Sequence, residues 1–426
     1  MKIKLRIIST LLLLLIVAQT GSAQSLDEYK IEAAQNNPEL RASYNEYQAA
    51  LQKAPQVRAL PDPELAFAYF ISPVETRLGP QKARLSATQM FPWFGSLADR
   101  ETASILNAKA KFEQFQEQRN RLFYNMEQLW ATLFEIQEQI RLANENLEIV
   151  NTLVNISVRK YETGLVPQVD VLRVQIEQED IKTNIQLMED NKELLIKRFN
   201  ELRNTEPAET IVLPESLSKY PALPFDEQEW LNKISAHNPN LNQLRYKEEA
   251  AETAIQIAEN NGLPFFGLGL DYISIGERDD IASLTDNGKD AWIARLSVKI
   301  PLFRGKYRAQ AEEATLMRSA AQDRIIAGEN QLETSFYTAM RDFEDAERRF
   351  RLYDEQQIQR VQQAVNILLQ SYASDNSQFE EILRLERKRF TYELERVKAK
   401  ADEFQAMSYL RYLSGEQNTT SEDINY

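Results

Sequence analysis

Residues 122–156 read LFYNMEQLWATLFEIQEQIRLANENLEIVNTLVNI, and this stretch decides the fold. Its apolar residues recur at alternating steps of four and three, which is the heptad pattern of a helix that packs along another helix. A second apolar line runs beside the first, so the helix can contact two neighbours. The first line comprises Leu122, Met126, Leu129, Leu133, Ile136, Ile140, Ala143, Leu147, Val150 and Val154, and the second comprises Phe134, Leu142, Ile149 and Ile156.

The segment around this seam has neither proline nor internal glycine from Leu97 to Thr163. At about 1.5 Å per residue, a helix of that length reaches about 100 Å. A long helix with two apolar edges suits the wall of a cylinder. Periodicity alone favours a fibrous coiled coil or a helical bundle as strongly.

A second seam lies later in the chain and has the same steps, apart from a register shift near Arg360. A shift of this kind changes the local supercoil of a coiled coil. The second seam comprises Leu332, Phe336, Ala339, Phe343, Ala346, Phe350 and Tyr353, and it resumes at Val361, Val365, Leu368 and Tyr372.

Three landmarks show that the chain is a tandem duplication, because they recur in the same order at offsets of 201, 209 and 211 residues. Asn37 and Asn238 are helix N-caps in this scheme, each followed by a proline that suits the first helical position. The landmark at 36–40 matches 237–241, the one at 91–95 matches 300–305, and the one at 161–173 matches 372–384.

The duplication sets the predicted domain organisation. Residues 1–23 form a signal peptide, 24–204 the first repeat, 205–226 a proline-containing linker, 227–415 the second repeat and 416–426 a polar tail.

The signal peptide is predicted from three cations, an apolar run from Leu11 to Ala18 and small residues before Gln24. The apolar run is too short to span a membrane, which takes about 20 residues. Because the chain contains no cysteine, we expect neither a lipid anchor nor a disulfide in the mature protein.

Each repeat also predicts a strand hairpin, at about 64–91 and about 265–300, from short aromatic and aliphatic runs with partial alternation. Their length fits the roughly 9 to 11 residues that a tilted strand needs to cross a bilayer. Residues 73–81 and 276–290 are polar and predict connecting loops. Four strands cannot close a barrel, so closure in lipid requires other copies of the chain.

Nothing in the sequence predicts catalysis. The one histidine, His237, stands where the other repeat has Asn36, and the seven methionines are scattered. Walker, serine-elbow and HExxH motifs are absent from the sequence. We therefore expect no enzyme activity, no cofactor and no metal site. Loss of the three cations of the signal peptide takes the net charge from −14 to −17, which argues against nucleic acid and against an anionic membrane surface as partners.

Several short motifs are similar to those of the TolC-like family of outer-membrane efflux proteins, and the resemblance covers about residues 26–415. PDPEL and PWFG are similar to the branch that serves heavy-metal exporters of the resistance-nodulation-division class. The motifs are Asn37-Pro38-Glu39-Leu40, PDPEL at 61–65, QMFPWFG at 89–95, and Tyr161-Glu162-Thr163-Gly164 with Asp170-Val171-Leu172.

The resemblance implies a mainly α fold with a small β part, in which duplicated coiled-coil helices form an α-barrel. It implies a homotrimer whose four strands per chain make a 12-stranded β-barrel in the outer membrane, above a periplasmic helical tunnel. The implied function is a passive duct of a tripartite efflux system. The implied partners are a periplasmic membrane-fusion adaptor, an inner-membrane pump of the resistance-nodulation-division class and outer-membrane lipid.

The resemblance also implies two functional regions at the helical tips, about 161–170 and about 372–381. An acidic residue after the second tip narrows the periplasmic aperture in that family, and Glu381 and its counterpart Asp170 hold that place here. Arg384 and Arg173 follow one turn later and form either a latch or a solvated surface pair worth a few tenths of a kcal/mol. The adaptor would dock at Thr163, Gly164, Leu165, Ser374, Asp375 and Asn376.

The alternative function is that of a soluble periplasmic structural coiled coil or an adaptor. An adaptor has one helical hairpin with lipoyl and barrel modules around it. This chain instead predicts two related hairpins with paired strands, which favours the duct.

Overall fold

The computed structural model describes residues 25–217, 226–280, 285–374 and 379–416. The predicted signal peptide, much of the linker and nearly all of the polar tail lie outside the described residues. The chain divides into two compact units. One consists of Met1–Ala42, Gln116–Asn238 and Asn330–Tyr426, and the other of Ser43–Phe115 and Pro239–Glu329.

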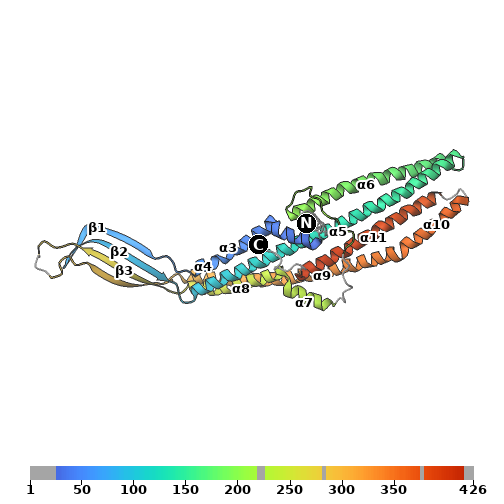
Figure 1. Cartoon of the computed structure of the whole chain (residues 1–426). Helices are drawn as coiled ribbons and strands as arrows, with labels where there is room; N and C mark the ends of the chain where they lie inside the picture. The colour runs from blue at the N-terminus through green and yellow to red at the C-terminus, as the bar shows by residue number, and fades with distance from the viewer. Residues whose placement is uncertain (1–24, 218–225, 281–284, 375–378, 417–426) are drawn as a thin grey trace, which may run out of the picture. The chain divides into compact units, whose positions relative to one another are not determined.

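The second of these units carries an antiparallel sheet in the order β1-β2-β3-β4 (Figure 1). Its strands are β1 (Glu64–Thr76), β2 (Gly79–Phe91), β3 (Phe265–Ile275) and β4 (Ala291–Lys299). Its helices are most of α3 (Pro38–Leu51), α4 (Lys53–Arg58), α8 (Pro239–Asn261) and the first parts of α5 (Ser96–Glu162) and α9 (Arg304–Leu352).

The prediction of a loop at 73–81 is wrong for most of its length. Strand β1 continues to Thr76, and strand β2 begins at Gly79. Pro73 lies on an edge strand, where the register shifts between Tyr69 and Val74. A proline, which has no N–H to donate, is tolerated at such an irregular edge position. The strands therefore continue past it and turn only at Arg77 and Leu78.

The two faces of the sheet differ in chemistry. On one face of β3, Leu268 and Leu270 are exposed. On the other face, Asp271 is buried and pairs with Arg84 and with Arg295, whose Nη2 lies 3.2 Å from its Oδ1. Gly269 gives Arg295 room, because a Cβ there would lie 3.1 Å from the arginine Nε. The predicted alternation of β3 is therefore present.

The remaining unit consists of helices and contains two long hairpins (Figure 1). Its elements are α2 (Leu26–Asn36), the later parts of α5 and α9, α6 (Gln168–Arg203), α7 (Glu227–His237), a π-helical turn η1 (Tyr353–Gln357), α10 (Ile358–Ser374) and α11 (Phe379–Ser414). The sequence did not predict α2 and α7 as separate helices before the asparagine caps.

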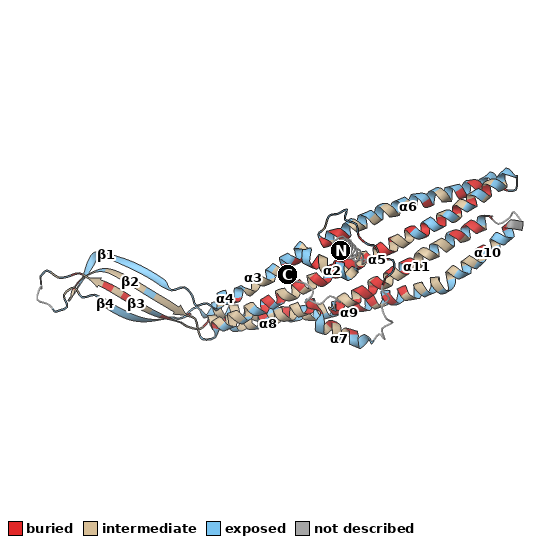
Figure 2. Cartoon of the chain, in the orientation of Figure 1, coloured by how far each residue is buried: buried red, intermediate tan, exposed pale blue. Residues whose placement is uncertain are grey.

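Most of the predicted seam of α5 is buried, and the rest is half-buried. Met126 and Leu133 are fully buried in the first line, and Phe134 and Leu142 are buried in the second. Figure 2 shows buried residues along α5. Toward the tips, a cluster of buried residues joins the two hairpins. It takes Val150, Leu153, Val174 and Ile181 from the first hairpin and Tyr372, Phe379, Ile382 and Leu383 from the second.

The register shift predicted near Arg360 has a structural counterpart in the π turn η1. Before this turn, Phe336 matches Met126 at an offset of 336 − 126 = 210 residues. After it, Val365 matches Val154 at an offset of 365 − 154 = 211 residues. A π turn holds one residue more than an α turn, so it absorbs the extra residue.

An asparagine fastens the start of each repeat to the end of its own return helix. Asn37 Oδ1 accepts from the Leu40 amide at 3.0 Å, which confirms it as a helix cap. Its Nδ2 donates to the Leu202 carbonyl at 3.2 Å, and the Nδ2 of Asn238 donates to the Leu413 carbonyl at 2.9 Å.

Both return helices end in a left-handed residue, Asn204 (φ 56°) in the first repeat and Gly415 (φ 72°) in the second. The Nδ2 of Asn204 donates to the Asn36 carbonyl at 3.3 Å. A Cβ on Gly415 would lie 2.4 Å from the carbonyl oxygen of His237, so glycine is required there. The side chain of His237 is exposed.

The cores beside α2 and α7 differ, and we call them the polar root and the apolar root. The polar root contains an ion pair between Lys30 and Glu127, whose side chains are 2% and 1% exposed. It also contains Arg203, which binds Glu32 at 2.9 Å and Glu209 at 2.8 Å. The apolar root comprises Trp230, Ile234, Phe336, Ala339, Phe343, Ala406, Met407, Leu410 and Leu413.

Candidate functional site: the helical tips

The first tip is a tight turn between α5 and α6. Gly164 has φ +70°, a conformation that glycine adopts without strain. The Leu165 amide donates to the Lys160 carbonyl at 2.8 Å, and the Thr163 hydroxyl donates to the same carbonyl at 3.0 Å. These bonds satisfy the end of α5, and they leave the Leu165 side chain half exposed.

The second tip is only partly described. Ser374 is the last residue of α10, and Asp375 and Asn376 lie outside the described residues. The adaptor-docking residues predicted for this tip are therefore untested.

Lys160 links the two tips. Its Nζ donates to the carbonyl of Tyr372 at 2.9 Å and lies 3.4 Å from the centroid of the Tyr372 ring. Burial raises the pKa of the Tyr372 hydroxyl above its ordinary value, and the nearby charge of Asp170 raises that pKa further. The lysine charge is well placed here, because the last carbonyls of α10 carry partial negative charge.

The predicted aperture residues lie in two pairs of different kinds. Arg173 Nη1 is 3.6 Å from Asp170 on its own helix and 3.0 Å from Glu380 on the other hairpin. Glu381 accepts from the Nε of Arg384 at 2.8 Å within α11. This hydrogen bond lowers the pKa of Glu381 and raises that of Arg384. The first pair joins the hairpins, and the second remains on one helix.

Sequence reasoning missed Glu380 and a further ion pair between Glu177 and Arg387, which also joins α6 to α11. A signal was present, because 170 and 177 are seven residues apart, as are 380 and 387. Residues one heptad apart share a helix face. The pairing of the faces depends on how the hairpins pack, which a single helix does not reveal.

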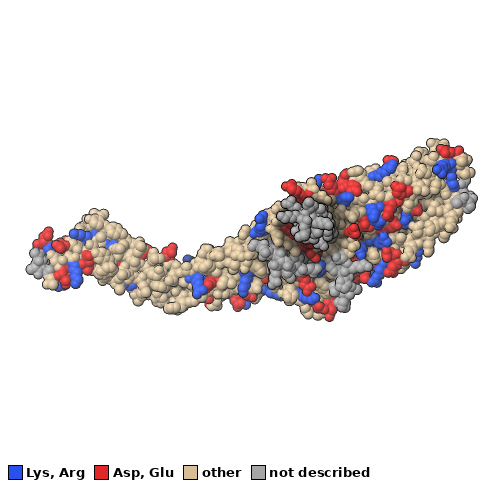
Figure 3. Space-filling view, in the orientation of Figure 1, with Lys and Arg blue, Asp and Glu red and all other residues tan. Residues whose placement is uncertain are grey.

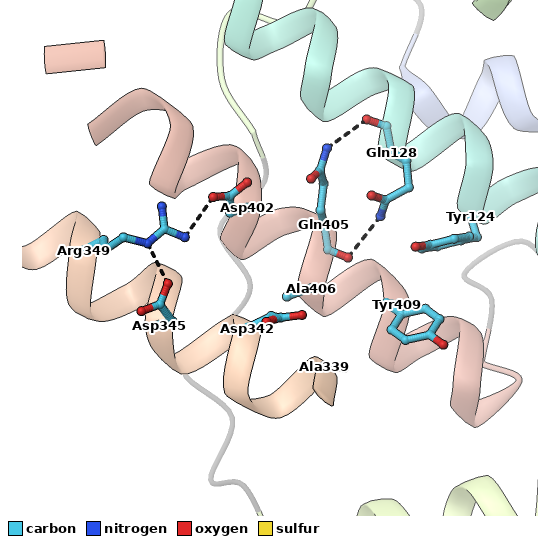
Figure 4. A pocket seen from close by; sticks show the side chains of 10 residues that line it. All are labelled: Tyr124, Gln128, Ala339, Asp342, Asp345, Arg349, Asp402, Gln405, Ala406 and Tyr409. Carbon is cyan, nitrogen blue, oxygen red and sulfur yellow. Dashed lines mark hydrogen bonds and ion pairs between the residues drawn. The ribbon is translucent and has the colours of Figure 1, made fainter. Parts of the chain in front are cut away.

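A pocket of about 260 Å³ lies deeper in the same unit, between α5, α9 and α11 (Figure 4). Gln128 and Gln405 bond each other's backbone carbonyls across it, with nitrogen–oxygen distances of 3.1 and 3.3 Å. Arg349 binds Asp345 at 2.7 Å and Asp402 at 2.8 Å. The ten residues that line the pocket include no histidine, cysteine or serine. The bonds between Gln128 and Gln405 join the two repeats, and the ion pairs of Arg349 join α9 to α11 within the second repeat.

None of the described helices is both long enough and apolar enough to cross a membrane. Among the described residues, no three side chains of the His, Cys, Asp and Glu types are grouped so that they would hold a metal ion.

Residues 31–196 match the model of the family described as outer membrane efflux protein. A curated relative is the alkaline protease secretion protein AprF of Pseudomonas aeruginosa, which is 23% identical over 299 residues. That match covers 66% of this chain and 61% of the relative, so the chain spans less than two thirds of its length.

Solved structures share the fold over nearly the whole chain. The outer-membrane channel OprN matches with a TM-score of 0.74 and 16% identity, over 92% of this chain and 89% of its own. VceC of Vibrio cholerae matches with a TM-score of 0.76 and 18% identity, over 92% of this chain and 96% of VceC. CusC matches with a TM-score of 0.77 and 15% identity, over 93% of each chain.

The match to the outer membrane efflux protein family lies within the first repeat, and the solved structures show that the chain shares the fold of OprN and CusC. The branch that serves heavy-metal exporters stays a prediction.

Proposed function

We propose that the chain is the outer-membrane channel subunit of a tripartite efflux system and acts as a passive duct. Three copies form the channel, each contributing four strands to a 12-stranded barrel and two hairpins to a periplasmic tunnel. The observation that carries the proposal is the sheet, whose outer strands β1 and β4 pair on one side only within the described chain.

The sheet has the properties that a lipid environment requires. Leu65, Phe67 and Ile71 on β1 and Leu296 on β4 are all more than two-thirds exposed. Figure 3 shows charged side chains at the loop end of the sheet and few charges between there and the helices. Open edges are very costly in lipid, where water cannot satisfy the backbone, so neighbouring copies must pair with β1 and β4.

The energy for transport comes from partners in this proposal. A periplasmic adaptor docks on the exposed first tip, at Thr163, Gly164 and Leu165, and on the matching second tip. An inner-membrane pump of the resistance-nodulation-division class drives the solute. The chain itself supplies no catalytic step.

The aperture lies at the same tips. Asp170, Arg173, Glu381 and Arg384 line it, and the contact of Arg173 with Glu380 holds the two hairpins of one chain together in the closed state. Support for this role comes from the 3.0 Å distance between these charged groups on different hairpins.

The latch is tested by single-channel conductance in planar bilayers. An exposed ion pair is worth about 0.2–1 kcal/mol, so Arg173→Gln should raise the ratio of open to closed channels by up to about fivefold per chain. Arg384→Gln is the matched control, since it breaks a pair confined to α11. If only the control variant opens the channel, Glu381 is the latch and Glu380 is not.

The channel itself is tested by fractionating cells that express the protein and running the outer-membrane extract, unboiled, on a gel. A trimer that dissociates on heating is the expected result. A monomer or dimer in the soluble periplasmic fraction would overturn the proposal and leave the structural coiled coil or adaptor as the function.

A further inference from the structure

The junction between β4 and α9 encloses a cavity of about 460 Å³. Its wall includes Phe265 from the start of β3, Lys299 from the end of β4, and Lys306 and Tyr307 from the first turns of α9. The Nζ of Lys299 lies 5.9 Å from the centroid of the Phe265 ring. With Phe303, two cationic side chains and three aromatic rings border one cavity.

The junction is basic in an acidic protein. Lys299, Arg304, Lys306 and Arg308 fall within ten residues, and the next acidic residue is Glu312. Arg304 Nη1 donates to the Gly262 carbonyl at 2.9 Å. In the part of the chain that the structure describes, none of these four cations forms an ion pair. No carboxylate of the described residues therefore balances their charge at close range.

The matching junction of the first repeat does not share this charge. It contains one acid, Asp99, and one base, Arg100, which bind the side-chain amides of Asn260 at 2.7 Å and Asn261 at 3.1 Å. The strand-to-helix turn therefore forms without excess positive charge. The four cations of the second junction need another explanation.

Exposed apolar side chains border the same cavity. Leu302 and Phe303 are 76% and 83% exposed, and Ile300 is also mostly exposed. Aromatic and apolar groups beside lysines are typical of the boundary between lipid and water, where the amines reach the head groups and the stems lie against acyl chains. The end of the sheet nearest the helices meets that boundary if the sheet spans the membrane.

We propose that this junction binds an anionic glycerophospholipid of the leaflet that faces the helices. Lys299 and Lys306 contact the phosphate, and Ile300, Leu302 and Phe303 pack along the first part of an acyl chain. The inference rests on the proposed membrane insertion of the sheet. Lysine suits the site because a compact ammonium group binds phosphate as a point charge.

The test uses full-length protein extracted from outer membranes, with phosphatidylglycerol binding followed by native mass spectrometry. Each lysine near an anionic head group is worth about a fivefold change in affinity, so Lys299→Gln/Lys306→Gln should bind about 30-fold more weakly. The control is Lys82→Gln, which removes an exposed lysine near the opposite end of the sheet and should bind as the original protein does.

Three results would overturn the inference. The double variant binds phosphatidylglycerol normally, or the original protein binds phosphatidylcholine as tightly, or soluble glycerol phosphate binds as tightly as the whole lipid. A fourth result would overturn the inference as well, namely that a neighbouring copy of the chain fills the cavity. In that case the trimer would carry no lipid, and the double variant would form a trimer that dissociates at a lower temperature. Failure of the channel proposal is separate, because the protein would then be absent from the outer membrane before any binding is measured.

Discussion

The long ascending helices of the two repeats reach the tips in different ways. In the first repeat α5 is one helix of 67 residues. In the second repeat α9 and α10 are separated by the π turn η1. The residues of both seams are buried or half-buried, and the seams match at an offset of 210 residues before the turn and 211 after it. A widened turn thus lets a helix carry an extra residue without rotating the face that it buries.

The polar root and the apolar root occupy equivalent places in the two repeats, and their side chains differ in chemistry. Trp230 stands where the first repeat has Tyr29, at 230 − 29 = 201, and both rings are buried. Tyr29 packs against the rings of Trp130 and Phe199, and Arg203 also lies 4.7 Å from its ring. Trp230 packs in a cluster of apolar residues that includes Phe336 and Met407, and Lys233 lies 5.7 Å from its ring. One backbone arrangement therefore accepts a polar core in one repeat and an apolar core in the other.

Deleting one exposed glutamate from each long helix gives the largest expected contrast. Glu145 in α5 and Glu355 in η1 are equivalent, at 355 − 145 = 210. Deleting Glu145 rotates the rest of α5 by about 100°, which should cost more than about 4 kcal/mol. Deleting Glu355 should convert the π turn to α-helix and cost under about 1 kcal/mol. Thermal unfolding of both variants measures the difference.

The control for these deletions is Glu145→Ala, because Glu145 also pairs with Arg141 at 2.6 Å on the helix surface. Loss of that exposed pair should cost no more than about 1 kcal/mol. Equal destabilisation by the two deletions would show that η1 does not absorb the extra residue.

The polar root should show the next largest effect. Glu127→Leu removes the buried partner of Lys30, which keeps the exposed Asp27 at 3.3 Å, and it also removes the contact of Glu127 with Arg411 at 3.8 Å. These losses should cost about 3 kcal/mol of unfolding free energy. Adding Lys30→Met should restore most of that stability, because an apolar pair avoids the cost of buried charge. Chemical denaturation of the single and double variants checks this. A double variant no better than the single one would mean that the ion pair is needed for packing.

The apolar root should respond to loss of volume and not to loss of charge. Leu410→Ala removes a fully buried side chain and should cost about 3 kcal/mol through lost contacts and a cavity. Because no ion pair is broken, the loss should be the same at low and high salt. A loss that varied with salt would mean that the two roots share one stabilising mechanism.

The smallest effect is expected at the Glu381–Arg384 pair. The pKa of Glu381 is lowered by its hydrogen bond from Arg384. A lowered folded-state pKa means that the pair stabilises the protein above the ordinary glutamate pKa, and that this contribution is lost as the pH falls through the lowered value. Arg384→Gln should therefore lower the unfolding temperature slightly at neutral pH and not at all in strong acid. A difference that grows in acid would contradict the sign.

The parts of the fold that depend on local periodicity were predictable from sequence. The seam through Met126 and Leu133, the cap at Asn37 and the alternation of β3 all repeat within a few residues. The extension of β1 past Pro73 was not predictable, because it depends on which strand lies at the edge. Neither was the contact of Arg173 with Glu380, which forms only when two hairpins separated by some 200 residues pack together.

Asn37 and Asn238 also bear on ancestry. Each fastens the first turns of a repeat to the last turn of the same repeat, so a repeat is closed before its twin is joined to it. A closed half can be copied within one gene without rebuilding either copy. This closure of each half fits a half-length ancestor whose gene was duplicated. If a half-length chain proves unable to form helices, the doubling must instead have preceded the closure.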